Sequence, residues 1–405
     1  MIPIIPIAPA PVTENPLVGQ LTSSGLRNPP PLSLYIHIPW CVRKCPYCDF
    51  NSHESRNPIP ESAYVDALIA DLEQATPLVW GRKVRSIFFG GGTPSLFSAE
   101  SIDRILSHVR MLTPLEYEAE ITLEANPGTF EAERFAGYRD AGVNRISIGI
   151  QSFNPRHLQA LGRIHNSEEA QYAAEHAIKI FGNVNLDLMY ALPEQTLEEA
   201  LQDMRTAIAL GPTHISAYHL TLEPNTPFYY KPPALPDDDT SATMQEAIEH
   251  LLAEHGYGHY ETSAFGKAGK RCRHNLNYWV FGDYLGIGAG AHSKLSFHDR
   301  ILRQSRIKQP NAYMKAVAET GHIEEERLLD RADLGFEFMM NALRLTEGFD
   351  PMLFTTMTGQ ALSTVEPALQ QAEQRGLITR TPELIAPTAL GQRFLNELLQ
   401  LFLEE

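Results

Sequence analysis

The sequence lacks several features that would each define a class of protein. It contains no uninterrupted run of about 18 apolar residues, the minimum length of a membrane-spanning helix. It has only four cysteines in 405 residues, too few for a disulfide scaffold. Basic side chains are also scarce, since 33 Lys and Arg stand against 49 Asp and Glu, giving a formal net charge of -16. These absences exclude a transmembrane helix and disfavour a broad nucleic-acid surface.

The composition of the chain is that of a folded protein, with 43% hydrophobic and 20% charged residues. Its length favours two or three domains. Residues 1–32 contain eight prolines, which prevent the apolar N-terminus from forming the helix of a signal peptide. We therefore expect a Pro-rich, disordered extension over 1–32.

After this extension, strand-length apolar segments alternate with amphipathic helical segments. The strands are expected at residues 32–40, 84–89, 120–123, 145–150, 184–189 and 214–218. Six such units in series predict a parallel sheet with helices outside, most simply a partial (β/α)6 barrel over 33–230. Polar residues follow each strand, at the end where ligand-binding loops gather in such barrels.

The regular alternation ends beyond residue 230. We expect an extension over 231–330 and a small, mostly helical, winged-helix-like domain over 331–405. Residues 336–405 contain four Arg, no Lys and nine Asp and Glu, a composition that argues against nucleic-acid binding.

Three of the four cysteines, Cys41, Cys45 and Cys48, lie within eight residues just after the first predicted strand. Thiolates are the ligands of iron-sulfur clusters, and three of them would leave one iron of a four-iron cluster open. A zinc site is the alternative, for which His37, His53 or Cys272 would supply a fourth ligand.

The Cys-x3-Cys-x2-Cys spacing and the segment Gly90-Gly91-Gly92-Thr93-Pro94 after the second strand resemble the radical S-adenosylmethionine (SAM) superfamily. In that superfamily the three cysteines hold a [4Fe-4S] cluster, and SAM binds its open iron. The resemblance implies that the residues contacting SAM are Tyr35, Gly91, Gly92, Thr93, Glu124, Gln151, Arg163 and Asp187.

From about Ser33 to His298 the chain resembles the branch that contains oxygen-independent coproporphyrinogen III dehydrogenase and the haem chaperones of the HemW type. The dehydrogenases have a further cysteine two places after the third cluster ligand, where this chain has Phe50. The chaperones have a His-Asn-x-x-Tyr-Trp motif implicated in haem binding. It is matched here by His274, Asn275, Tyr278 and Trp279.

The resemblance implies a haem chaperone that binds the cluster, SAM and haem, and passes haem to acceptor haem proteins, expected to be respiratory enzymes. The alternative is the dehydrogenase, an oxidative decarboxylase of porphyrin biosynthesis, so whether the protein is an enzyme stays open. We expect a cytoplasmic monomer or homodimer with at most peripheral membrane contact, and we expect Cys272 to have no role in binding haem.

Overall fold

The computed structural model describes residues 26–319 and 321–403. Residues 1–25, most of the predicted Pro-rich extension, lie outside the described residues. The backbone N–H of Leu26 donates to the carbonyl of His298 at 3.0 Å, and the Leu26 side chain is buried. The described part of the extension is therefore packed against the fold.

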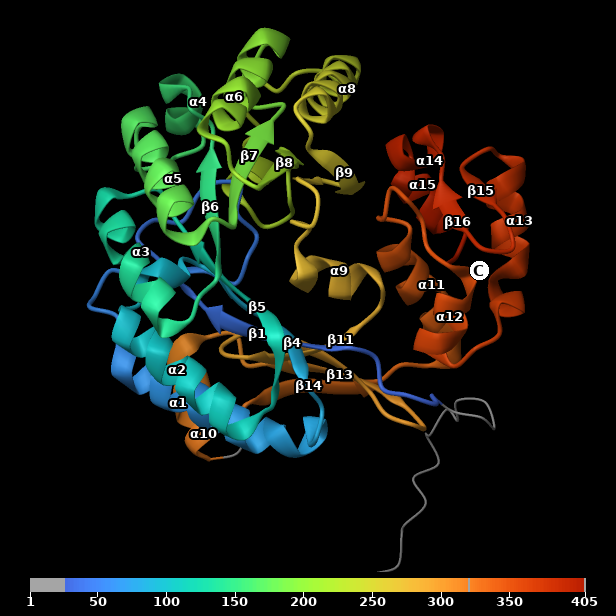
Figure 1. Ribbon diagram of the computed structural model, residues 1–405, viewed down its shortest axis with the longest axis horizontal. Helices are drawn as coiled ribbons and strands as arrows, with labels where there is room; N and C mark the ends of the chain where they lie inside the picture. Colours follow the sequence, from blue (N-terminus) through green and yellow to red (C-terminus); the bar gives the residue numbers. More distant parts are fainter. Residues whose placement is uncertain (1–25, 320, 404–405) are drawn as a thin grey trace, which may run out of the picture.

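Six parallel strands form the centre of the main sheet, as predicted (Figure 1). They lie side by side in chain order: β1 (Leu32–Ile38), β4 (Val84–Gly91), β5 (Leu115–Ala125), β6 (Arg145–Gln151), β7 (Val184–Tyr190) and β8 (His214–His219). Since all six are parallel, their carboxyl ends meet at one end of the barrel, where the cysteine and glycine loops lie.

Helices cover the outer face of this sheet (Figure 1). They are α1 (Glu61–Ala75), α2 (Ala99–Leu112), α3 (Thr129–Ala141), α4 (Pro155–Ala160), α5 (Ser167–Phe181), α6 (Leu197–Leu210) and α8 (Asp238–Glu254). Local sequence sets their ends: α5 and α6 begin with capping boxes at Asn166 and Thr196, and end at Gly182 and Gly211 in the left-handed conformation.

The segment between 231 and 330 extends the sheet at both edges, which the sequence did not reveal. Next to β1 lies β11 (Asp283–Ile287), parallel to it, followed by antiparallel β12 (His292–Ser296), β13 (Ile301–Arg306) and β14 (Ile323–Leu328). At the other edge, β10 (Ala264–Gly266) and β9 (Gly258–Glu261) follow β8. The fold is an α/β barrel with a mixed, open sheet.

The C-terminal region is helical, with one short hairpin, and forms a second hydrophobic core. Its elements are α11 (Arg331–Ala342), α12 (Pro351–Thr358), η3 (Leu362–Val365), α13 (Glu366–Gln374), β15 (Ile378–Arg380), β16 (Ile385–Pro387), α14 (Ala389–Arg393) and α15 (Leu395–Gln400). The helix α9 (Arg273–Trp279) lies between this region and the barrel (Figure 1). Phe281 and Ile301, from the barrel side, belong to the second core.

Short elements complete the chain: β2 (Trp40–Cys41), β3 (His53–Glu54), η1 (Thr76–Val79), η2 (Pro94–Leu96), α7 (Pro227–Tyr230) and α10 (Pro310–Ala318). Among the described residues, no helix is both long and apolar enough to cross a membrane.

Candidate functional site

The three clustered cysteines lie on the loop that leaves β1 at the carboxyl end of the barrel, and each is partly exposed. Nη1 of Arg163 lies 3.6 Å from the Sγ of Cys45, and the Oγ of Ser52 lies 3.7 Å from the Sγ of Cys48. Burial raises the pKa of the Cys41 thiol, although a hydrogen bond with Thr93 opposes this.

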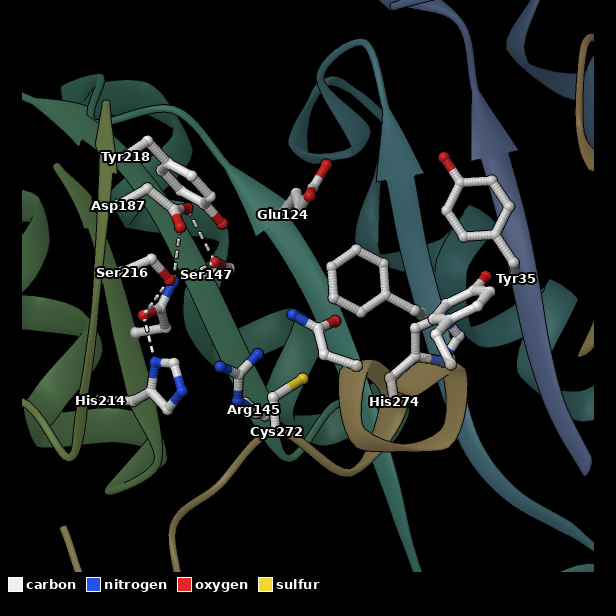
Figure 2. A pocket seen from close by; sticks show the side chains of 14 residues that line it. Tyr35, Glu124, Arg145, Ser147, Asp187, His214, Ser216, Tyr218, Cys272 and His274 are labelled. Carbon is white, nitrogen blue, oxygen red and sulfur yellow. Dashed lines mark hydrogen bonds between the residues drawn. The ribbon is translucent and has the colours of Figure 1, made fainter. Parts of the chain in front are cut away.

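The three thiols of this loop are of the donor type that holds an iron-sulfur cluster. Nowhere in the described residues do three His, Cys, Asp or Glu side chains converge as ligands of one metal ion. In a four-iron cluster each thiolate binds its own iron, so three sulfurs spaced around a loop suffice. Cys272, a candidate fourth zinc ligand, belongs to the opposite end of the barrel (Figure 2).

The glycine loop packs tightly against the cysteine loop. Gly91 has a φ of +117°, and a Cβ there would lie 2.5 Å from the His37 ring. A Cβ at Gly92 would lie 2.5 Å from the carbonyl oxygen of Trp40. These two positions therefore require glycine for the packing of the protein itself, in addition to any close approach to a ligand.

Thr93, Gln151 and Arg163 surround the same end of the barrel. The Thr93 hydroxyl accepts a hydrogen bond from Asn126 at 2.9 Å, and Gln151 has a φ of 69°, which is strained for a residue with a side chain. Nη2 of Arg163 donates to Oδ1 of Asn126 and to the carbonyl of Gly149, both at 2.7 Å. In this arrangement the Arg163 guanidinium braces the loops around Cys45.

A cavity of about 240 Å³ occupies the barrel interior below these loops (Figure 2). We call it the lumen cavity. Its lining residues are Tyr35, Phe88, Glu124, Arg145, Ser147, Asn185, Asp187, His214, Ser216, Tyr218, Cys272, His274, Asn275 and Tyr278. It thus brings together three of the residues predicted to contact SAM and three of those predicted to contact haem.

The acidic residues of the lumen cavity have raised pKa values. Burial, reinforced by the nearby Asp187, raises the pKa of Glu124 to about 8, even though Glu124 accepts a hydrogen bond from the Gly91 N–H at 3.2 Å. Burial also raises the pKa of Asp187, against hydrogen bonds from Ser147 and Asn185. At neutral pH Glu124 is therefore mostly protonated in the ligand-free protein.

The helix α9 closes the amino-terminal end of the barrel and presents His274 to the lumen cavity (Figure 2). Nδ1 of His274 is 3.1 Å from the Ser86 hydroxyl, and the ring stacks on Phe88 with centroids 4.9 Å apart. Within the described residues its Nε2 is buried without a hydrogen-bond partner. Burial lowers the pKa of His274 to about 3, so the imidazole is neutral at physiological pH.

The other motif residues divide between the two sides of α9. Asn275 and Tyr278 line the lumen cavity with His274. Trp279 instead packs against the second hydrophobic core, with the guanidinium of Arg344 5.0 Å from its ring centroid. The four motif residues therefore do not share one surface.

Sequence reasoning missed the polar groups on the far side of the lumen cavity. Nδ1 of His214 lies 2.6 Å from Oδ1 of Asn185, and its Nε2 lies 2.7 Å from the Tyr260 hydroxyl. Arg145 and Ser147 reach the cavity from β6 because alternate strand residues face one side, while Ile146, Ile148 and Ile150 face the helices. The alternation of polar and apolar residues in β6 was the sequence signal that could have predicted Arg145 and Ser147 as cavity-lining residues.

Cys272 also lines the lumen cavity, with its Sγ 3.6 Å from Oε1 of the buried Glu120. Burial raises the pKa of this thiol to about 12, so it is protonated and a poor nucleophile at neutral pH.

Comparison with known proteins agrees with this fold. The family model described as the radical SAM superfamily matches residues 35–207, and the model of the HemN C-terminal domain matches residues 329–394. The solved structure of coproporphyrinogen III oxidase (HemN) from Escherichia coli, a radical SAM enzyme, superposes with a TM-score of 0.79 at 25% identity, covering 92% of this chain and 90% of that one. The fold is thus that of a radical SAM protein.

Two curated relatives define the branch. The heme chaperone HemW of Haemophilus influenzae is 53% identical over 93% of this chain and 99% of its own length. HemW of Escherichia coli is 50% identical over the same shares of the two chains. The chain belongs to the HemW family of heme chaperones.

Proposed function

We propose that the protein is a haem chaperone that binds a [4Fe-4S] cluster, SAM and haem, and transfers haem to acceptor haem proteins, with respiratory enzymes as the expected acceptors. The observation that carries the proposal is a cavity that joins the predicted SAM end of the barrel to His274 of the haem motif, in a chain of the HemW family. Each feature alone would be compatible with a different function.

We assign Cys41, Cys45 and Cys48 to the cluster. The cluster would supply an open iron to which the amino and carboxylate groups of SAM bind. Tyr35, Gly91, Gly92, Thr93, Glu124, Gln151, Arg163 and Asp187 form the proposed SAM pocket. The support is that these residues meet at the carboxyl end of the barrel and in the upper part of the lumen cavity.

We assign His274 as the iron ligand of haem, with Asn275 and Tyr278 as neighbouring contacts. Trp279, which the sequence also predicts to contact haem, packs on the other side of α9. The Ser86 hydroxyl engages Nδ1 and leaves Nε2 free, an arrangement that orients a ligating imidazole. The low pKa of His274 keeps the imidazole neutral, and Nε2 can bind iron in the tautomer in which Nδ1 donates to the Ser86 hydroxyl.

A porphyrin does not fit the lumen cavity as it stands. Pockets for drug-sized molecules measure about 300–1,000 Å³, whereas this cavity measures about 240 Å³. Haem binding at His274 therefore requires α9 to move away from the barrel. Such a displacement would also separate Leu276 and Trp279 from the second core.

The experiment is haem titration of the anaerobically purified, cluster-loaded protein, followed by its absorption spectrum. We expect His274→Ala to shift the Soret band, because an axial bond is lost, and Trp279→Ala to retain the wild-type band. Identical spectra and affinities in all three proteins would remove the haem assignment from this motif.

The alternative function is oxygen-independent coproporphyrinogen III decarboxylation, favoured by the similarity to HemN over nearly the whole chain. Phe50, at the position of the additional cysteine, has a mostly exposed phenyl ring that cannot exchange a proton or hydrogen atom as a thiol does. We expect no multiple-turnover conversion of coproporphyrinogen III to protoporphyrinogen. Sustained turnover would make the enzyme the correct assignment.

The remaining proposals concern the setting of the protein. We place it in the cytoplasm, where clustered thiols stay reduced, as a monomer or homodimer. Contact with the membrane would be peripheral and would occur at the acceptor.

A further inference from the structure

The lumen cavity contains a buried positive charge that belongs to neither the proposed SAM pocket nor the proposed haem contacts. The side chain of Arg145 enters the cavity from the start of β6, beside Cys272 (Figure 2). The residue is 2% exposed. In the described part of the chain no hydrogen bond or ion pair engages its guanidinium, and its Nε is buried without a partner.

The other fully buried basic residues of the described chain, Lys294 and Arg306, have partners for their charged groups, although the Nε of Arg306 is also buried without one. The ammonium of Lys294 donates to Oδ1 of Asp283 at 3.1 Å. The guanidinium of Arg306 donates to the Ser293 hydroxyl at 2.9 Å and lies 3.4 Å from Oδ1 of Asp71. A buried charge is costly unless it is paired, so this fold normally provides partners.

The acidic groups around Arg145 do not act as its partners. Burial lowers the pKa of Arg145, but the nearby Cys272 and Glu120 more than offset this and raise it. Glu120 nevertheless forms no ion pair with Arg145, and its Oε1 accepts from the backbone N–H of His274 at 3.2 Å. Asp187 is held by Ser147 and Asn185. The neighbouring charges lower the free-energy cost of burying the guanidinium, but its N–H donors remain available to a ligand.

We propose that Arg145 is the receptor of a carboxylate that enters the lumen cavity. A guanidinium presents parallel N–H donors that match the two oxygens of a carboxylate. The cavity has room for a small carboxylic acid or for one propionate arm of a porphyrin, though not for the macrocycle. The assignment of the carboxylate to a haem propionate rests on the proposed haem-binding function. The assignment of Arg145 as a carboxylate receptor does not.

The test uses anaerobically purified, cluster-loaded full-length protein with two kinds of probe. Haem is compared with haem dimethyl ester by absorption titration, and succinate is compared with succinamide by thermal shift. The variants are Arg145→Met, which removes the charge, and Arg145→Lys, which keeps the charge without the fork. The control is Arg273→Met on α9, since Arg273 is partly exposed and bonds outward to the Glu118 carbonyl at 2.7 Å.

If a propionate is bound, wild type and Arg273→Met will prefer haem over its ester by about tenfold or more, because a charge-assisted hydrogen bond is lost on esterification. Arg145→Met will show no preference, and Arg145→Lys a reduced one. If a free carboxylate is bound, succinate will raise the melting temperature of wild type and Arg273→Met, and succinamide will not. Arg145→Met will lose this response.

Either of these two results supports Arg145 as a carboxylate receptor and identifies whether the carboxylate belongs to haem or to a free acid. Equal binding of haem and its ester, together with equal responses to succinate and succinamide in wild type, overturns the proposal without requiring any variant to fold. Failure of wild type to bind haem at all would overturn the proposed chaperone function, while the succinate comparison would still decide the role of Arg145.

Discussion

At the scale of single residues, Glu124 shows how the barrel interior alters ordinary side-chain chemistry. The carboxyl of the unfolded chain titrates at its ordinary pKa of 4.5, whereas that of the folded chain titrates at about 8. Between these values the folded state binds more protons than the unfolded state, so stability falls as pH rises. The contribution of Glu124 is therefore most favourable below the unfolded pKa and is lost as pH rises to the folded pKa.

We predict that Glu124→Gln stabilises the ligand-free protein relative to wild type, and more at about pH 8 than at about pH 5. Glutamine keeps an acceptor for the Gly91 N–H but has no charge to desolvate. Melting temperatures measured across this range test the prediction. The control is Glu116→Gln on the same strand, where the side chain is exposed. A difference between variant and wild type that did not change with pH would contradict it.

Gly91 offers a second prediction at this scale. Gly91→Ala adds a Cβ 2.5 Å from His37, in a left-handed backbone conformation. Gly182→Ala is the matched control, because Gly182 has a φ of +64° but open space around it. We expect the control to lose about 1 kcal/mol, and Gly91→Ala to lose about 1–3 kcal/mol more through overpacking. If both variants lost the same free energy of unfolding in chemical denaturation, the His37 ring would be able to move aside at no measurable cost.

At the scale of elements, α9 packs against both the barrel and the C-terminal region. One side of this helix lines the lumen cavity through His274 and Tyr278, and the other packs against the second core through Leu276 and Trp279. A helix of seven residues has little stability of its own. Its position therefore depends on both neighbours.

We predict that Trp279→Ala lowers the free energy of unfolding by about 1–3 kcal/mol, because it removes partly buried apolar area and the contact with Arg344. It should also speed hydrogen exchange of the α9 amides. Arg273→Ala, on the same helix but facing outward, should change neither. Unchanged exchange in Trp279→Ala would mean that the barrel alone holds α9.

At the scale of the whole molecule, aromatic contacts within the second hydrophobic core attach the C-terminal region to the segment that follows α9. Phe338 of α11 is fully buried, and its ring centroid lies 5.7 Å from that of Phe281, which follows α9. The same ring contacts Phe349 and Phe354 within the C-terminal region. Loss of this side chain would therefore loosen the C-terminal region and its attachment to the barrel together.

We expect Phe338→Ala to destabilise the protein by about 3–5 kcal/mol and to increase exchange in α9. Phe135→Ala is the comparison, since Phe135 is equally buried but lies in the first core against Phe181. Phe135→Ala should speed hydrogen exchange of the α9 amides only as far as it destabilises the whole protein. A separate early melting transition in Phe338→Ala, with α9 still protected, would show that the two parts unfold independently.

The sequence by itself determined the six central strands, most of the helices that cover them, and the loop with the three cysteines, because periodicity and spacing report local structure directly. Glycines 91 and 92 were also recognisable, although their packing against His37 and Trp40 was not. The roles of the predicted SAM and haem residues stay predictions.

Only the tertiary structure decided which distant segments meet. It placed β11 beside β1, set α9 at the amino-terminal end of the barrel, opposite the cysteine loop, and separated Trp279 from His274. It also brought Arg145 to a cavity wall shared with Cys272, 127 positions later in the chain. The physical reason is that a local pattern shows which face of an element is buried, whereas the partner on that face is chosen only when the sheet curves and encloses the lumen.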